Sequence, residues 1–237
     1  MTTIDNADQV GSRLRTAREQ SGASLRELAR RLNISASALS QIETGKSRPS
    51  VKTLYAIVSE LGLSLDELFA DPAQVRATPG PAPVATGAAP NGDVALDGNP
   101  AAAVEAAVTP VVQHGDSRAS LELDSGVTWE RLTPSNDPDV DFLMAIYEPG
   151  GASSSNEKLV RHNGREYGIV LEGELELQIG FDIEVLGPGD SACFDSQQPH
   201  RLVNRGAAQA RAIWFVIGRR QSDQRNPRFD GDAPAET

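Results

Sequence analysis

Basic side chains, which can neutralise phosphate groups, are concentrated in one short part of the chain. Residues 11–53 contain nine arginines and lysines and only three acidic residues, so this segment carries a net charge of +6. The whole chain of 237 residues carries −11, which leaves −17 for the remainder. Such asymmetry is typical of a basic module joined to an acidic one. Because the acidic part repels DNA, we expect only the basic segment to approach it.

Cysteine content and hydropathy limit the class of protein. The single cysteine, Cys193, excludes an internal disulfide framework and a zinc site made of several cysteines. It stands between Ala192 and Phe194, which predicts a small buried side chain rather than a redox sensor. No apolar run reaches the roughly 18 residues that a membrane span needs, and the first residues lack the pattern of a signal peptide. We therefore expect a cytoplasmic protein without a membrane partner.

The basic segment falls within residues 9–69, whose apolar spacing predicts five short helices. Ser24 and Glu27 have the spacing of a capping box at the start of the second helix. Asn33 breaks that helix, and Gly45 is expected to end the third one at its C′ position. The expected helices cover residues 9–20, 24–32, 35–44, 50–61 and 65–69.

The rest of the chain divides into three parts. Residues 70–108 are rich in Ala, Pro and Gly and lack an apolar period, which predicts a flexible linker. Residues 109–218 contain short β-rich runs with Gly and Pro turns, which favour an antiparallel sandwich or barrel. Within them, Glu172-Gly173 is interpreted as a hairpin turn. Residues 219–237 are polar and aperiodic, and we expect them to be disordered.

The helical part resembles the helix-turn-helix domain of the XRE family of bacterial regulators, a five-helix fold of the λ-repressor type. The matching positions are Leu28-Ala29, Asn33-Ile34-Ser35, Leu39-Ser40, Ile42-Glu43, Gly45-Lys46, Pro49-Ser50, Leu54 and Leu61-Gly62. The resemblance implies that the third helix enters the major groove of double-stranded DNA. Gln can pair with adenine and Ala can meet a thymine methyl group, whereas the loop after that helix suits phosphate contacts. The candidate DNA-binding residues are Ser24, Arg26, Ser35, Ala36, Ser37, Ser40, Gln41, Lys46, Ser47 and Arg48.

The β-rich part resembles the cupin superfamily, whose members are double-stranded β-helix barrels. Glu166 and Gly173 end the first cupin motif, and Gly189, His200 and Asn204 match the second. The resemblance implies that His162, Glu166 and His200 project into the barrel and hold one divalent metal ion. Two imidazoles and one carboxylate suit non-haem Fe(II), with Mn, Ni, Co and Zn as alternatives. Val160 stands where the family has another histidine, so an organic effector bound directly by these polar residues is the other interpretation.

Two functions follow from this α + β two-domain organisation. The first is a transcriptional regulator that binds an operator as a homodimer, because a twofold dimer doubles the base contacts of one module. Its cupin domain would sense a small-molecule effector, with or without a metal, and the protein would not be an enzyme. The alternative is a mononuclear non-haem iron oxygenase or epoxidase of the cupin type with a helix-turn-helix-like helical domain.

Overall fold

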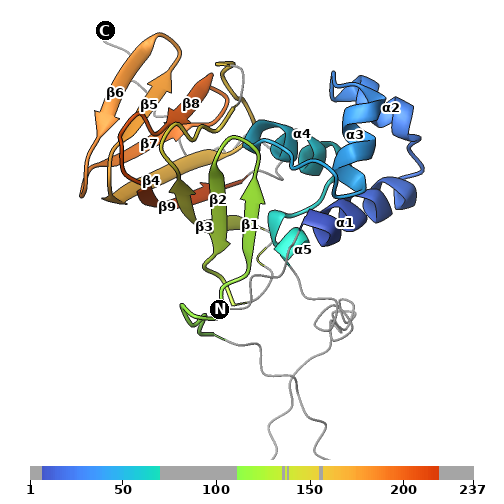
Figure 1. The fold of residues 1–237 in the computed structure, drawn as a ribbon, viewed down its shortest axis with the longest axis horizontal. Helices are drawn as coiled ribbons and strands as arrows, with labels where there is room; N and C mark the ends of the chain where they lie inside the picture. Colours follow the sequence, from blue (N-terminus) through green and yellow to red (C-terminus); the bar gives the residue numbers. More distant parts are fainter. Residues whose placement is uncertain (1–6, 70–110, 135–136, 138, 155–156, 219–237) are drawn as a thin grey trace, which may run out of the picture.

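The computed structural model describes residues 7–69, 111–134, 137, 139–154 and 157–218. The linker predicted over residues 70–108 and the tail predicted over residues 219–237 lie outside the described residues. Within the described part, a helical domain is followed by a domain of two β-sheets, as Figure 1 shows. None of the described helices is both long and apolar enough to cross a membrane.

The helical domain contains the five helices that the sequence predicts. They are α1 (Ala7–Gln20), α2 (Leu25–Arg31), α3 (Ala36–Glu43), α4 (Val51–Leu61) and α5 (Leu65–Phe69). Serine side chains at N-cap positions begin three of them: Ser24 accepts a hydrogen bond from the Glu27 amide, Ser35 from Ala38 and Ser50 from Thr53. Asn33 and Gly45 both adopt positive φ, which explains why α2 and α3 end there.

A buried ion pair fixes α3 against α1. Arg18 of α1 forms two hydrogen bonds with the Glu43 carboxylate, at 2.6 Å from Nε to Oε1 and 3.0 Å from Nη2 to Oε2. Arg18 is 8% exposed and Glu43 is 5% exposed. A two-point bond of this kind holds both side chains in one geometry. It therefore sets the direction of α3, the helix that is expected to enter DNA.

The second domain consists of antiparallel strands in two sheets. Its strands are β1 (Ser120–Leu123), β2 (Val127–Arg131), β3 (Val140–Tyr147), β4 (Arg165–Glu172), β5 (Leu175–Ile179), β6 (Asp182–Leu186), β7 (Ser191–Asp195), β8 (His200–Val203) and β9 (Ala210–Ile217). The six-stranded sheet has the order β1-β2-β3-β9-β4-β7, and the three-stranded sheet has the order β6-β5-β8. Their inner faces supply buried side chains to the core, so the predicted α + β organisation with an antiparallel barrel is confirmed.

Two local predictions for this domain are wrong. Glu172-Gly173 does not join a hairpin, because β4 pairs with β7 and β9 whereas β5 pairs with β6 and β8. The turn instead carries the chain from one sheet to the other. Cys193 is exposed rather than buried: it stands opposite Tyr167 of β4, on the outer face of the larger sheet, and accepts a hydrogen bond from Arg165.

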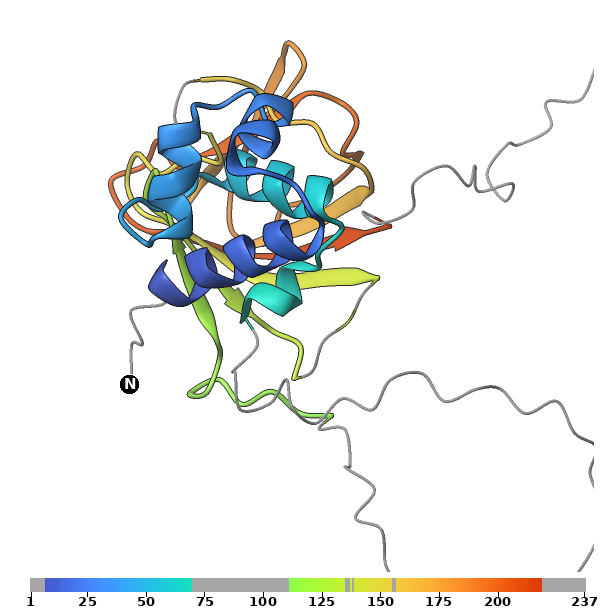
Figure 2. The ribbon, with the colours of Figure 1, turned by 90° about the vertical axis from the view of Figure 1, so that its right-hand side faces the viewer.

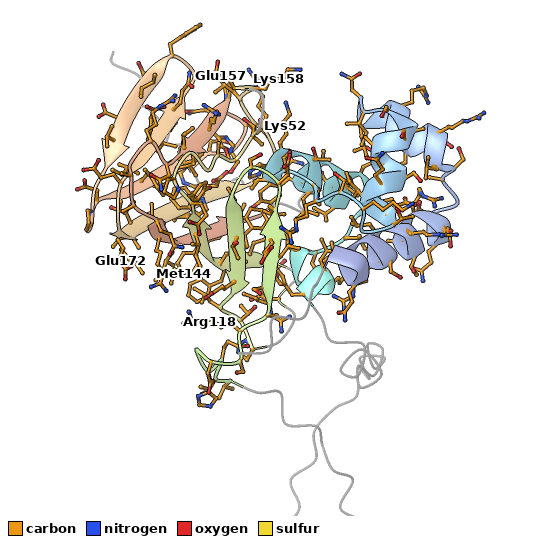
Figure 3. The ribbon with its side chains drawn as sticks, viewed as in Figure 1. Lys52, Arg118, Met144, Glu157, Lys158 and Glu172 are labelled. Atoms are coloured by element: carbon orange, nitrogen blue, oxygen red, sulfur yellow. The ribbon has the colours of Figure 1, made fainter. Side chains whose placement is uncertain are left out.

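The two domains meet along α4. Figures 1 and 2 show α4 between the other helices and the ends of the strands. The amide of Lys52 donates to the carbonyl of Ser153 at 3.3 Å, and Figure 3 labels Lys52 where α4 reaches the sheets. One hydrophobic cluster runs across this junction and includes Val51 and Tyr55 of α4 together with Trp129 of β2. The DNA-binding candidate domain is therefore docked on the β-domain by apolar packing.

Candidate functional site

The three residues that the sequence singles out as metal ligands meet inside the β-domain. Glu166 lies on β4, His200 begins β8, and His162 precedes β4. Nε2 of His162 lies 2.9 Å from Oε1 of Glu166, and Nε2 of His200 lies 3.1 Å from the same oxygen. All three ligand atoms lie within 4.8 Å of one another, and each of the three side chains is 5% exposed. The chain thus brings two imidazoles and one carboxylate to a single buried point.

The other atoms of these side chains are held by the surrounding protein. Nδ1 of His162 lies 3.0 Å from the carbonyl of Asn163, and Nδ1 of His200 lies 2.8 Å from the carbonyl of Gln198. A carbonyl only accepts, so both Nδ1 atoms carry a proton, and in the neutral form of each ring Nε2 presents its lone pair toward Glu166. The indole N–H of Trp214 donates to Oε2 of Glu166 at 2.6 Å, which leaves Oε1 to face the histidines.

This donor set fits a divalent cation. Oε1 of Glu166 is buried, and no hydrogen-bond donor in the described part of the chain points at it, although both Nε2 atoms lie close by. Three electron-pair donors that face one another repel unless a cation or a proton lies between them. A metal held by both Nε2 atoms and Oε1 would satisfy all three, and the Nδ1 and Oε2 contacts are the outer hydrogen bonds that typically orient metal ligands.

The same contacts shift the ionisation of the triad. Burial alone would raise the pKa of Glu166, but the two imidazoles outweigh burial and hold this pKa below its usual value. Burial would lower the pKa of His200, and the Glu166 carboxylate outweighs this effect and raises that pKa above 6.5. Glu166 is therefore a carboxylate at neutral pH, and it favours a positive charge next to it.

Aromatic and aliphatic side chains form the wall around the triad. The lining residues are Val51, Tyr55, Trp129, Leu143, Ala145, Tyr147, Ser153, Val160, His162, Glu166, His200, Leu202 and Trp214. Val160, at the position of the missing family histidine, is 2% exposed and exchanges two backbone hydrogen bonds with His200. Trp214 fits because Gly168 stands opposite: a Cβ atom there would lie 1.9 Å from the indole. Apolar walls with a few convergent polar groups are the usual composition of a small-molecule site.

The sequence missed several members of this site. Tyr55 and Trp129 gave no signal, because they belong to apolar stretches that a domain core also requires. Val51 belongs to α4 of the helical domain, yet it also lines the pocket. Trp214 lies in the wholly apolar run of residues 213–217, whose sequence does not indicate which side chains face inward, whereas its pairing with Gly168 in the structure does.

Most candidate DNA-binding residues of the helical domain are exposed. The exposed ones are Ser24, Arg26, Ser35, Ser37, Gln41, Lys46, Ser47 and Arg48, whereas Ser40 is half-buried. Ala36 is also half-buried and packs against the hydrophobic core. Arg48 has a partner outside its own domain, because Nη2 lies 2.6 Å from Oε2 of Glu122 on β1. The third histidine, His114, is exposed and takes no part in either site.

Comparison with known proteins agrees with both halves of this description. Residues 14–68 match the family model described as helix-turn-helix, and residues 143–216 match the model of the cupin domain. The chain joins an XRE-type helix-turn-helix domain to a cupin domain. The HTH-type transcriptional regulator PuuR of Escherichia coli is 28% identical to it over 203 residues, which cover 86% of this chain and 91% of the regulator.

One solved structure shows a similar fold over most of the chain. An HTH_3 family transcriptional regulator from Vibrio cholerae superposes with a TM-score of 0.57 at 20% identity, over 90% of this chain and 98% of that one. This similarity confirms the fold. Hydroxypropylphosphonic acid epoxidase from S. wedmorenis gives a TM-score of 0.39 at 21% identity, over 89% of this chain and 98% of that one. At that TM-score the similarity supports no argument about activity.

Proposed function

We propose that this protein is a sequence-specific transcriptional regulator that binds operator DNA through α3. The observation that carries this proposal is the exposed, small polar face of α3, which includes Ser37 and Gln41 and is followed by the basic loop of Lys46 and Arg48. A major groove admits such a helix, and its base edges can pair with Gln41. Acting on chromosomal DNA places the protein in the cytoplasm.

The relatives favour this function over the iron oxygenase. The curated relative that aligns with most of this chain is a transcriptional regulator. The net charge of +6 in residues 11–53 also suits DNA, whereas a helical cover of an enzyme has no need of it. The test is a selection of genomic fragments by the purified full chain at low salt. Recovery of one recurring motif is the expected result, and the absence of any bound fragment would contradict the proposal.

The cupin pocket serves as the sensor in this proposal. His162, Glu166 and His200 would hold one divalent metal ion, which would offer open coordination positions to an organic effector. The apolar wall, including Trp129 and Leu143, would enclose the rest of that effector. His162→Ala is expected to abolish the effector response while operator binding at low salt persists. Oxygen consumption by the iron-loaded protein that disappears in Glu166→Ala would favour the oxygenase instead.

Homodimerisation is supported by the outer face of the larger sheet. Ile169 and Leu171 of β4 are 38% and 39% exposed, and Ile217 of β9 is 43% exposed. Beside them, Phe215 stacks on Phe142 with ring centroids 4.2 Å apart. A contiguous apolar face of this kind marks an association site. Ile169→Asp is expected to halve the mass measured by light scattering, and an unchanged dimer mass would place the dimer contact elsewhere.

A further inference from the structure

Two side chains of α4, Val51 and Tyr55, line the cupin pocket. The ring of Tyr55 stacks on His162, with centroids 4.5 Å apart and planes inclined by 21°. It also contacts Trp129 of β2, at 5.3 Å between centroids. Tyr55 is 6% exposed, so this phenol ring is buried in the ligand site of the other domain.

The space left beside the triad is small. The cavity has a volume of about 30 Å³, which accommodates a water molecule or a metal ion. An organic ligand needs a pocket of several hundred Å³. Such an effector can reach the triad only when Tyr55 leaves, and its apolar part then takes the place of the phenol ring against His162.

A second contact of the same junction involves the candidate DNA-binding loop. Arg48 is paired with Glu122 of β1 at 2.6 Å. Directly beside this pair, the amide of Asp124 donates to the carbonyl of Pro49 at 2.9 Å. In the docked arrangement, Arg48, which is expected to bind a DNA phosphate, is instead paired with Glu122. The negative charge of Glu122 therefore lies next to the basic loop. Both effects weaken the attraction of this loop to DNA.

We propose that this junction is a latch that couples the cupin pocket to DNA binding, an inference that rests on the regulator function proposed above. In the docked state, Tyr55 closes the pocket and Glu122 holds Arg48. An organic effector displaces Tyr55, α4 leaves the cupin domain, and Arg48 becomes available to DNA. Effector and DNA then favour the same undocked state, so each strengthens the binding of the other.

The Arg48 contact is tested with Glu122→Gln in the full chain. Glu122 is 46% exposed as a side chain, so its replacement is expected to leave the fold intact. We expect DNA affinity to rise about two- to fivefold, which corresponds to the usual strength of an exposed ion pair. The slope of log affinity against log salt should stay nearly unchanged, because Arg48 meets the same phosphate in the DNA complex of both proteins.

Two further variants make this measurement specific. Glu176→Gln removes an equal charge from an ion pair within the cupin domain, that of Glu176 on β5 with Arg205, and it should change neither quantity. In an Arg48→Ala background, Glu122→Gln should have a much smaller effect, because only the repulsion between the Glu122 carboxylate and DNA remains. If Glu122→Gln and Glu176→Gln behave alike while the wild type binds DNA, the latch is wrong and the regulator function stands.

The Tyr55 contact is tested with phenol as the probe. Both tryptophans of the sequence, Trp129 and Trp214, line the pocket, so tryptophan emission excited at 295 nm reports on its contents. Tyr55→Ala is expected to show a saturable change on addition of phenol, because the vacated site has the shape of that ring. The wild type and Phe181→Ala, which removes a fully exposed aromatic ring, should not respond.

Each outcome of the phenol titration supports or contradicts the role of Tyr55 as the cover of the pocket. An equal response of the wild type and Tyr55→Ala, or no response of a folded Tyr55→Ala, would overturn the role of Tyr55 as the cover of the pocket. If the wild type binds no DNA at all, the regulator function fails, and the titration still shows whether Tyr55 closes the site. Should Tyr55→Ala not fold, the Glu122→Gln comparison decides the latch alone.

Discussion

The imidazole of His162, a candidate metal ligand of the cupin domain, stacks on the phenol ring of Tyr55, which belongs to the helix-turn-helix domain. The ring centroids are 4.5 Å apart. A change at the triad can therefore reach α4 through one van der Waals contact and does not have to pass along residues 70–108. Because of this direct contact, an effector in the pocket can have different affinities for the docked and the undocked state. Any coupling between a sensor pocket and DNA requires such a difference.

Trp214 is expected to be a positioning residue for the metal. Its N–H holds Oε2 of Glu166 at 2.6 Å and so directs Oε1 toward the histidines. Trp214→Phe should lower the affinity for Ni(II) or Mn(II) by about 10- to 100-fold, the usual effect of losing an outer hydrogen bond of a metal ligand. Titration calorimetry measures this change. Trp129→Phe, which alters the other tryptophan of the same wall, is the control and should bind metal as the wild type does.

Metal affinity should rise with pH across the neutral range. A metal requires the neutral form of each imidazole, so protons compete with it below the histidine pKa. The Glu166 carboxylate raises the pKa of His200 above 6.5, and this competition therefore begins at a higher pH than for an isolated histidine. Calorimetric titrations at pH 6, 7 and 8 are expected to show increasing affinity. Affinity that is equal at pH 6 and pH 8 would contradict ligation by His200.

The pair of Arg18 and Glu43 is expected to stabilise the helical domain. Both side chains are nearly fully buried, and removal of Glu43 leaves the buried Arg18 cation with only the Glu19 carboxylate at 3.5 Å and the Ala23 carbonyl as partners. Glu43→Ala should therefore lower the free energy of unfolding by about 3 kcal/mol. Chemical denaturation followed by far-UV circular dichroism measures this change. Glu19→Ala, which removes an exposed carboxylate of α1, should cost less than about 1 kcal/mol, and equal losses would contradict a special role of the buried pair.

The sequence predicted those features of the molecule that depend on residues close together in the chain. Serine caps and positive-φ positions such as Asn33 set the helix ends, and these depend on neighbours in the chain. The spacing of His162, Glu166 and His200 identified the triad through a resemblance, and the structure brings these residues together.

Features that depend on distant residues were not predictable. Strand β9 alternates between buried and more exposed positions, but from Ile213 onward its outer residues are apolar too, so this run of the sequence conceals the inward direction of Trp214. Cys193 stands between Ala192 and Phe194 yet is exposed, because it points to the opposite face of β7 from these two residues. The role of Tyr55 arises only when two domains meet, and no pattern within α4 distinguishes a core residue from one that covers another domain.

DNA recognition should separate into a base-reading part and a phosphate-binding part. Gln41 is exposed on α3, and Gln41→Ala should relax the preference at one base pair at a cost of roughly 1–3 kcal/mol. Lys46 is exposed in the loop after α3, and Lys46→Ala should weaken binding to all sequences alike and flatten the salt dependence by about 0.9.

Fluorescence anisotropy with the selected motif, a single-base variant and an unrelated fragment, each at several salt concentrations, distinguishes these two effects. Arg15→Ala is the charge-matched control for Lys46→Ala, because Arg15 lies on α1 and pairs with Glu19 at 2.9 Å. It should leave the salt slope nearly unchanged, since a cation that meets no phosphate releases no counterion. If Gln41→Ala instead weakens all three fragments equally, α3 does not read bases at that position, and recognition must come from another element of the helical domain.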